Sequence, residues 1–265
     1  MKDKNNILTI IKENKDCLLY TSYQSKNIFY QVIGEGEPLL FLHGDTASSK
    51  MFEMILPLYQ DCFQCILIDF LGNGQSDRVK EFPIQLWEDQ ALQTIALLEH
   101  LSYDRVHLLG TSGGAYVALH VVMKKPELIG KVIADSFDGR TLREGFADDL
   151  LAERNFSIKD ADAKLFYEWC QGEDWLSVVE ANTRSLVSLA QSQEPLFHDS
   201  FESIKNPLLL IGSLNDEMLG QNLKDEFDDI LKDVMHGSSY LFKDGQHPTV
   251  LSRAEEVAQI VKDFI

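Results

Sequence analysis

Cysteine is scarce in this sequence of 265 residues. Its four cysteines, Cys17, Cys62, Cys65 and Cys170, are too few and too irregularly spaced for a disulfide framework. Cys62 and Cys65 have C-x-x-C spacing, but a zinc site needs a second close pair of Cys or His, and a thioredoxin-like site needs the pair at the start of a helix. We therefore predict thiols that lie beside or within a strand.

Positive charge and long apolar runs are also scarce. The chain has 24 Lys and Arg residues against 42 Asp and Glu residues, a formal net charge of -18. Nucleic acids and anionic membranes attract basic surfaces, whereas the charge of this chain is strongly negative. Near the N-terminus the apolar run 7–11 is too short for a signal peptide or a membrane span. These shortages predict a cytoplasmic protein that binds neither nucleic acid nor a membrane.

Short runs rich in Ile, Leu and Val are abundant, and helical patterns separate most of them. Runs without strict alternation are typical of strands covered on both faces. The expected strands are 18–24, 27–33, 38–43, 64–69, 106–109, 132–135, 208–211 and 239–243. The expected helices are 51–58, 84–101, 113–123, 219–234 and 252–264. This alternation predicts an α/β fold with a mostly parallel eight-stranded sheet and helices on both faces.

One long segment, 138–203, contains helical patterns but no convincing strand. It is too long for a plain loop, so we expect a helical cap inserted between the sixth and seventh strands. The core then comprises 1–137 and 204–265. Aromatic, Leu and His side chains of the insertion are candidates for facing a substrate, although such residues more often pack helices together. The candidates are Phe166, Tyr167, Trp169, Trp175, Leu176, Phe197 and His198.

A glycine-rich turn, Gly110-Thr111-Ser112-Gly113-Gly114, joins an expected strand to an expected helix. G-x-S-x-G in that position is typical of a sharp, strained turn that exposes the serine hydroxyl above the strand ends. The backbone N–H of Gly113 would lie at a helix N-terminus, which favours negative charge. The alternative is a small-residue turn in which Ser112 only caps the helix.

A general base and its carboxylate partner are needed to activate a serine hydroxyl. His247 and Asp216 suit these roles, because each follows an expected strand and so lies at the same sheet edge as Ser112. Asp135 also ends a strand and is a rival for the carboxylate. We favour Asp216 because of its place in the motif order.

The motifs PLLFLHGDTASS, IDFLGNGQSD and GTSGG, followed by Asp216 and His247, occur in the order seen in the α/β-hydrolase fold superfamily. Apart from the insertion, residues 18–265 resemble this superfamily. The resemblance implies that Ser112 is the nucleophile, His247 the base and Asp216 the acid, with no metal or organic cofactor required.

The resemblance also assigns the oxyanion hole to the backbone N–H groups of Gly113 and Asp45. A carboxylate beside a developing oxyanion repels it, so we expect Asp45 to turn away and to bond to its own loop. Thr46, Ser48 and Ser49 are its expected partners. His43 is expected to be structural, because one histidine already fills the base role.

The expected function is hydrolysis of a small or medium carboxylic ester through an acyl-enzyme on Ser112, with a small-molecule substrate that carries a carbonyl group. The same triad also supports cleavage of carbon–carbon or amide bonds, or perhydrolysis, because one fold hosts many reactions. A ligand-binding protein with a vestigial triad is a further alternative.

Overall fold

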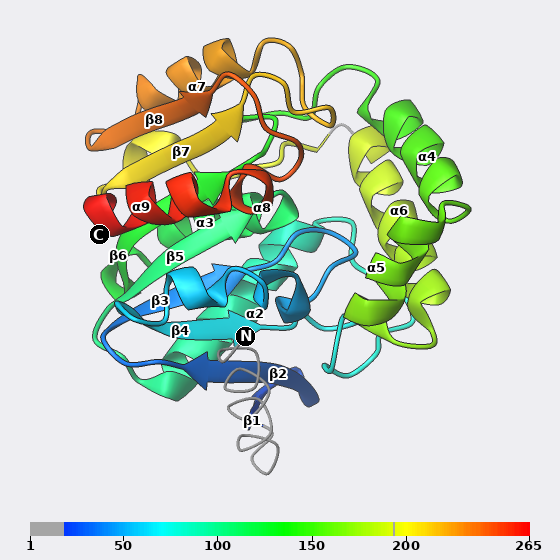
Figure 1. The fold of residues 1–265 in the computed structure, drawn as a ribbon, viewed down its shortest axis with the longest axis horizontal. Helices are drawn as coiled ribbons and strands as arrows, with labels where there is room; N and C mark the ends of the chain where they lie inside the picture. The colour runs from blue at the N-terminus through cyan, green and yellow to red at the C-terminus, as the bar shows by residue number, and fades with distance from the viewer. Residues whose placement is uncertain (1–18, 193) are drawn as a thin grey trace, which may run out of the picture.

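An eight-stranded sheet forms the centre of the protein, seen here in a computed structural model that describes residues 19–192 and 194–265 (Figure 1). The strands run in the order β1-β2-β4-β3-β5-β6-β7-β8. β1 and β2 form a hairpin, β2 pairs antiparallel with β4, and all the other pairings are parallel. The strands are β1 (Leu19–Tyr23), β2 (Lys26–Ile33), β3 (Glu37–Leu42), β4 (Phe63–Ile68), β5 (Val106–Thr111), β6 (Ile129–Asp135), β7 (Leu208–Ser213) and β8 (Gly237–Phe242).

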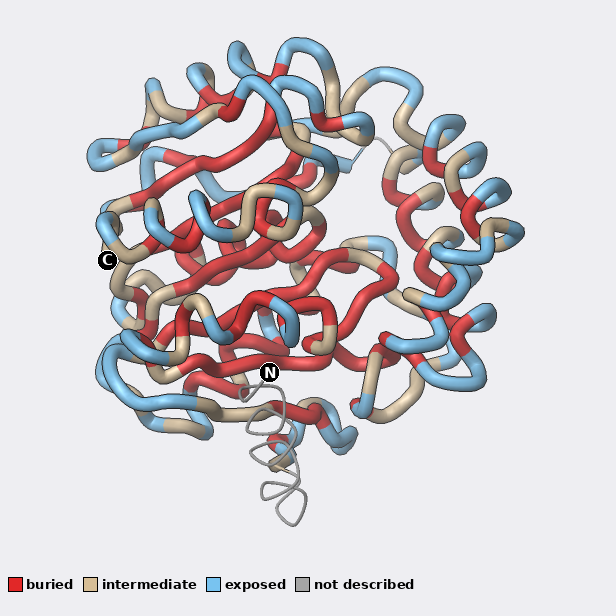
Figure 2. Tube along the Cα trace, viewed as in Figure 1, coloured by how far each residue is buried: buried red, intermediate tan, exposed pale blue. Residues whose placement is uncertain are grey.

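The predicted fold class is therefore confirmed, and each predicted strand overlaps an observed one. Leu18, where the first strand was expected to begin, and Cys17 lie outside the described residues. The central strands are buried along most of their length (Figure 2), which explains their continuous apolar sequences. Cys65 lies within β4, where burial raises the pKa of its thiol to about 12, and exposed Cys62 immediately precedes the strand. The predicted placement of this pair is thus confirmed.

Helices cover both faces of the sheet. On one face pack α2 (Leu86–Leu101), α3 (Gly113–Lys124) and α7 (Leu223–Leu231). On the other pack α8 (Thr249–Ser252), α9 (Ala254–Phe264) and two short 3-10 helices, η1 (Ser49–Phe52) and η2 (Leu56–Leu58). The sheet is thus the middle layer of three.

Two predicted helices are interrupted in the structure, and a third, 219–234, is shorter and spans Leu223–Leu231. The segment 51–58 is not an α-helix, because Pro57 has no N–H and disfavours α-helical backbone at the residue before it. The segment 252–264 is interrupted at Arg253, whose φ of -124° and ψ of 42° are not helical. In the described part of the chain, no helix combines the length and apolarity needed to cross a membrane.

A separate layer of helices stands beyond the carboxyl ends of the parallel strands (Figure 1). It consists of α4 (Phe146–Ser157), α5 (Ala161–Gln171) and α6 (Trp175–Ser192), which lie between β6 and β7 in the chain together with the short helix η4 (Phe201–Ser203). We call α4, α5 and α6 the helical layer. Arg78 of the core forms a paired ion contact with Asp174, just before α6, at 2.8 Å for both nitrogen–oxygen pairs. The layer is therefore tied to the core by polar contacts as well as by packing.

Candidate active site

Ser112 occupies a strained turn between β5 and α3. Its φ of 54° and ψ of -124° are unusual for a residue with a side chain. Two flanking glycines make the turn possible, because a Cβ atom at Gly110 would lie 2.0 Å from the Gly114 carbonyl oxygen, and one at Gly114 would lie 2.1 Å from the Leu42 carbonyl oxygen. Thus the strand and helix approach so closely that only glycine fits at either position.

His247 links Ser112 to Asp216. The His247 Nε2 atom lies 3.0 Å from Ser112 Oγ, and its Nδ1 atom lies 2.9 Å and 3.1 Å from the two Asp216 carboxylate oxygens. Asp216 follows β7 and His247 follows β8, so both loops leave the carboxyl edge of the sheet. The Asp216 side chain is 0% exposed and that of His247 is 10% exposed. A serine hydroxyl, an imidazole and a carboxylate thus form one hydrogen-bonded chain, in which a proton can pass from Oγ to the ring.

Burial by itself lowers the pKa of His247. The hydrogen bond to Asp216 and the negative charges of Asp216, Asp135 and Glu217 outweigh this effect, so the pKa is raised above its ordinary value. Glu217 also contacts the backbone of this histidine, because its carboxylate accepts a hydrogen bond from the His247 N–H at 3.2 Å. The raised pKa favours transfer of a proton to the imidazole.

Asp135, the alternative carboxylate, has other partners. Its Oδ2 atom accepts hydrogen bonds from the Thr111 hydroxyl at 2.7 Å and from the Val250 N–H at 3.1 Å. It makes no hydrogen bond to His247 among the described contacts. Burial raises the pKa of Asp135 to about 6. The geometry therefore pairs the imidazole with Asp216 and leaves Asp135 beneath the site as a carboxylate held by β5 and α8.

The loop after β3 packs directly against the serine. A Cβ atom built on Gly44 would lie 3.1 Å from Ser112 Cβ, so the backbone of this loop borders the hydroxyl. Within the described residues, neither the Asp45 N–H nor the Gly113 N–H donates a hydrogen bond to the protein. Both N–H groups are thus available to an anion. His43 supports the same loop, because its Nδ1 atom lies 2.8 Å from the Gly44 carbonyl oxygen and its Nε2 atom accepts a hydrogen bond from the Phe70 N–H.

The expected partners of the Asp45 carboxylate were wrong. It accepts hydrogen bonds from Trp87 Nε1 at 3.2 Å and from Asn182 Nδ2 at 3.1 Å, instead of bonding to its own loop. It also stays beside the serine turn, since a Cβ on Gly113 would lie 2.5 Å from its Oδ2 atom. The expected donors are engaged elsewhere. The Thr46 hydroxyl donates to the Asp45 backbone carbonyl, the Ser48 hydroxyl donates to that of Cys170, and the Ser49 N–H donates to the Asp69 carboxylate. Burial raises the pKa of Asp45.

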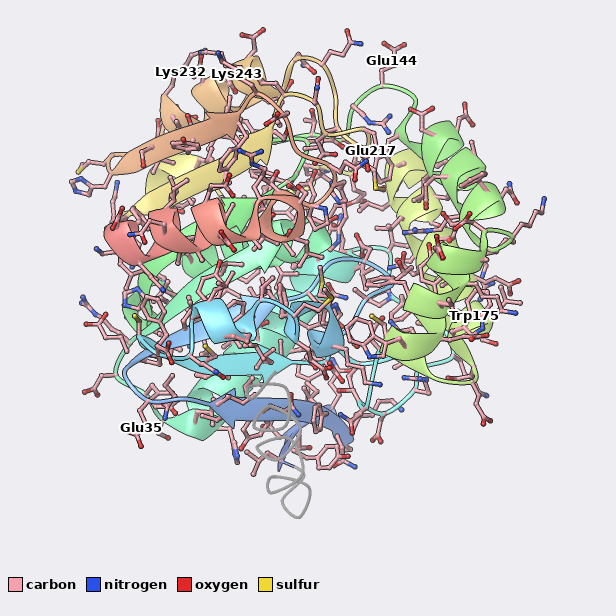
Figure 3. The ribbon with its side chains drawn as sticks, viewed as in Figure 1. Glu35, Glu144, Trp175, Glu217, Lys232 and Lys243 are labelled. Carbon is pink, nitrogen blue, oxygen red and sulfur yellow. The ribbon has the colours of Figure 1, made fainter. Side chains whose placement is uncertain are left out.

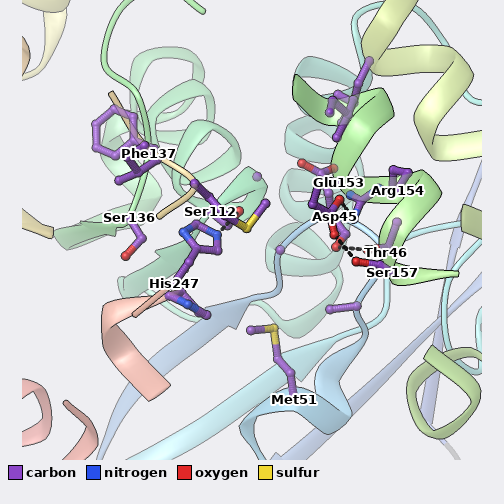
Figure 4. A pocket seen from close by; sticks show the side chains of 18 of the residues that line it. Asp45, Thr46, Met51, Ser112, Ser136, Phe137, Glu153, Arg154, Ser157 and His247 are labelled. Atoms are coloured by element: carbon purple, nitrogen blue, oxygen red, sulfur yellow. Dashed lines mark hydrogen bonds and ion pairs between the residues drawn. The ribbon is translucent and has the colours of Figure 1, made fainter. Parts of the chain in front are cut away.

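Ser112 and His247 open onto a cavity of about 370 Å³ between the sheet edge and the helical layer (Figure 4). Most of the residues that line it are apolar, among them Met51, Phe146, Leu150, Phe166, Tyr167, Leu186 and Leu219. On the side of α4, the polar side chains of Glu153, Arg154 and Ser157 also line the cavity. The site therefore offers a mostly apolar chamber with one polar corner.

Of the residues of the insertion 138–203 expected to face a substrate, Phe166 and Tyr167 line the cavity. Trp169 does not line the cavity, and it is 37% exposed. Trp175 does not line it either, and its ring stacks on Tyr167 with 5.6 Å between ring centroids. Figure 3 shows Trp175 at the end of the layer away from Glu217. Leu176, Phe197 and His198 also lie outside the cavity, since Leu176 and His198 are exposed and Phe197 packs on His120 and Phe201.

Sequence reasoning missed Arg154, Asn182 and Trp87 at the site. A signal for Arg154 exists in the helical periodicity, because Leu150, Arg154 and Ser157 recur at spacings of four and three residues and share the buried face of α4. An arginine on such a face is a candidate for an internal site. The same signal exists for Asn182, because Val178, Asn182 and Leu186 recur at spacings of four residues and share the buried face of α6.

Comparisons with known proteins agree with this architecture. Residues 37–171, about half of the chain, match the model of a family described as alpha/beta hydrolase fold. An uncharacterized hydrolase of Bacillus subtilis, YugF, is 33% identical over 97 residues, which cover 37% of this chain and 35% of YugF. A proline iminopeptidase of Clostridium botulinum is 32% identical over 126 residues, which cover 44% of this chain and 42% of that protein. Both alignments thus span less than half of the relative.

Solved structures extend the likeness to nearly the whole chain. An esterase of Exiguobacterium antarcticum, EaEST, superimposes with a TM-score of 0.72. The match covers 94% of this chain and 99% of the esterase, at 18% sequence identity. At this identity, the similarity concerns the fold.

Proposed function

Because the chain belongs to the alpha/beta hydrolase fold family, we propose that it is a serine hydrolase that cleaves small or medium carboxylic esters. Ser112 is the nucleophile, His247 the general base and acid, and Asp216 the carboxylate that orients the imidazole. The observation that carries the proposal is the hydrogen-bonded chain from Ser112 Oγ through His247 to Asp216, which opens onto a cavity.

The reaction begins with proton transfer. Neutral His247 accepts the Ser112 proton at Nε2 while Oγ attacks the ester carbonyl carbon, and Asp216 stabilises the imidazolium that forms. The negative charge passes to the former carbonyl oxygen, which the N–H groups of Gly113 and Asp45 hold. His247 then donates its proton to the departing alcohol oxygen, which leaves an acyl group on Ser112. Water, activated by the same imidazole, attacks the acyl carbon and releases the carboxylic acid.

The cavity suits this reaction in size and polarity. About 370 Å³ accommodates a small or medium ester. The apolar lining from Met51, Leu150 and Phe166 favours the hydrocarbon part of such a molecule. We assign residues 138–203 as a cap over a core formed by 1–137 and 204–265, because α4 supplies cavity residues from above the sheet edge.

A series of 4-nitrophenyl esters from acetate to octanoate, with matching 4-nitroanilides, tests the proposal. We expect turnover of the shorter esters and little turnover of the anilides. Ser112→Ala should lower kcat by about 1,000-fold or more without unfolding the protein. Undiminished ester hydrolysis by Ser112→Ala would contradict the proposal. A preference for the anilides would show that the substrate is an amide and not an ester.

A further inference from the structure

Arg154 lies in the polar corner of the cavity, across from Ser112 and His247 (Figure 4). It belongs to α4 and is only 9% exposed. Of the described residues that line this cavity, it is the only one with a permanent positive charge. A buried cation is costly unless it is paired, so its partners indicate what the corner can bind.

The guanidinium group is only partly paired. Its Nη1 atom donates to the Tyr167 hydroxyl at 3.0 Å and to a Glu153 carboxylate oxygen at 2.9 Å. Its Nε atom is buried without a hydrogen-bond partner, and Nη2 makes no hydrogen bond to the described residues. Nη1 of the guanidinium group is thus paired with the protein, whereas the edge formed by Nε and Nη2 is unpaired. Nε and Nη2 are parallel donors, the geometry that matches a carboxylate. Because Nε is covered by the protein, a carboxylate reaches both donors only when the Arg154 side chain moves.

Three carboxylates also line the cavity, but each already has donors. Asp45 accepts from Trp87 and Asn182, Asp138 accepts from the Gly220 N–H and lies 3.8 Å from Arg143, and Glu153 accepts from Ser157 and Arg154. No described carboxylate of the cavity is left without a donor. Arg154, whose charge also acts on Asp45, is therefore the charged residue of the described lining with donors left unpaired, and an acceptor on the ligand would pair them.

We propose that Arg154 binds a carboxylate of the substrate, so that the preferred esters are half-esters of dicarboxylic acids or esters with an equivalent free carboxylate. This inference rests on the proposed ester hydrolysis and names the class of ester. The apolar walls hold the hydrocarbon chain between the two ends, the scissile carbonyl lies at Ser112, and the free carboxylate lies at Arg154. Arg154 is thus a specificity-determining residue.

Three methyl esters with six-carbon acyl chains test the charge preference, with proton release recorded in a pH-stat. They are monomethyl adipate (anionic), methyl hexanoate (neutral) and methyl 6-aminohexanoate (cationic); monomethyl glutarate and pimelate vary the spacing. We expect the best half-ester to exceed methyl hexanoate in kcat/KM by about 10-fold or more. A wild-type enzyme that prefers methyl hexanoate or the amino ester to every half-ester would overturn the inference.

Substitution of the arginine should act mainly on the anionic substrates. Arg154→Met is expected to lower kcat/KM for the half-esters by about 10- to 100-fold, chiefly through KM, and to change methyl hexanoate by less than about 3-fold. Arg154→Lys should retain part of the preference. Arg184→Met, at an exposed position of α6, is the matched control and should change neither. Equal losses on charged and neutral esters would show that Arg154 only supports the fold.

Direct binding separates this inference from the proposed function. Titration calorimetry of Ser112→Ala with adipate and glutarate should detect binding that Arg154→Met weakens by at least about 10-fold. If no ester is hydrolysed but these dianions bind through Arg154, the proposed function fails and the anion site stands. If neutral esters are hydrolysed through Ser112 but the dianions do not bind, the inference fails and the function stands.

Discussion

Gln171, at the end of α5, offers a sharp test of how the helical layer is joined to the catalytic loops. Its side chain is almost completely buried, with the residue 3% exposed. Nε2 donates to the backbone carbonyls of Thr46 at 3.0 Å and Ala47 at 2.8 Å, and Oε1 accepts from the Gly74 N–H at 2.8 Å. One side chain of the helical layer therefore satisfies three backbone groups in two loops of the core. Nε2 also donates to Asn73 Oδ1 at 3.2 Å, and Gln171→Met keeps the length of the side chain but removes all four hydrogen bonds.

The expected loss follows from what is left unpaired. A buried polar group that loses its partner costs about 1–3 kcal/mol, and three backbone groups and Asn73 Oδ1 lose theirs together. Partial relaxation and water entry reduce the sum, so we expect the free energy of unfolding to fall by about 3 kcal/mol. For a chain of this size, that corresponds to a decrease in Tm of about 6 °C or more. Because the Thr46–Ala47 backbone continues from Asp45, kcat/KM for a neutral ester should also fall.

Urea unfolding followed by tryptophan fluorescence and circular dichroism measures the change. Gln259→Met is the matched control, since Gln259 lies exposed on α9 and its side chain, among the described residues, donates to Asp263 alone. The control should stay within about 0.5 kcal/mol of wild type. If Gln171→Met lost no more stability than Gln259→Met, the four hydrogen bonds of Gln171 would not contribute as the structure implies.

Three further predictions concern the site itself. Asp216→Asn should lower kcat for a neutral ester by about 1,000- to 10,000-fold, and Asp135→Asn far less, in steady-state assays; the reverse order would transfer the carboxylate role to Asp135. The kcat/KM profile should decline as pH falls through the raised pKa of His247. Glu217→Gln removes one of the charges that raise this pKa, so it should move the decline to lower pH. No movement, or movement to higher pH, would show that Glu217 does not raise the pKa of His247. Gly114→Ala should destabilise the fold by about 3 kcal/mol in urea titrations, since its Cβ meets the Leu42 carbonyl, and near-wild-type stability would show that the turn can relax.

The sheet was predictable because its signal is local. Buried strands such as β5 and β7 consist of short apolar runs bounded by loops, and a run identifies a strand wherever it lies in the fold. Helix interruptions were harder to predict, because their causes are local but weak. Pro57 within 51–58 was a visible warning, whereas the break at Arg253 has no sequence signal that we can identify.

The residues at the strand ends could be located from the sequence because topology brings them together. The carboxyl ends of parallel strands share one edge, so Ser112, Asp216 and His247 were expected there despite their separation in the chain. Residues from the helical layer could not be placed in this way. How α4 and α6 sit over the sheet depends on the loops and packing that connect them, so the contacts of Arg154 and Asn182 emerged only from the structure.

The central claim is that Ser112 is a nucleophile activated by His247, and covalent labelling with a fluorophosphonate followed by peptide mass spectrometry tests it most directly. The account predicts one adduct per chain, on the peptide that contains Ser112. The adduct should be absent in Ser112→Ala and form at least about 100-fold more slowly in His247→Ala. Labelling at another residue, no labelling at all, or an undiminished rate in His247→Ala would contradict it.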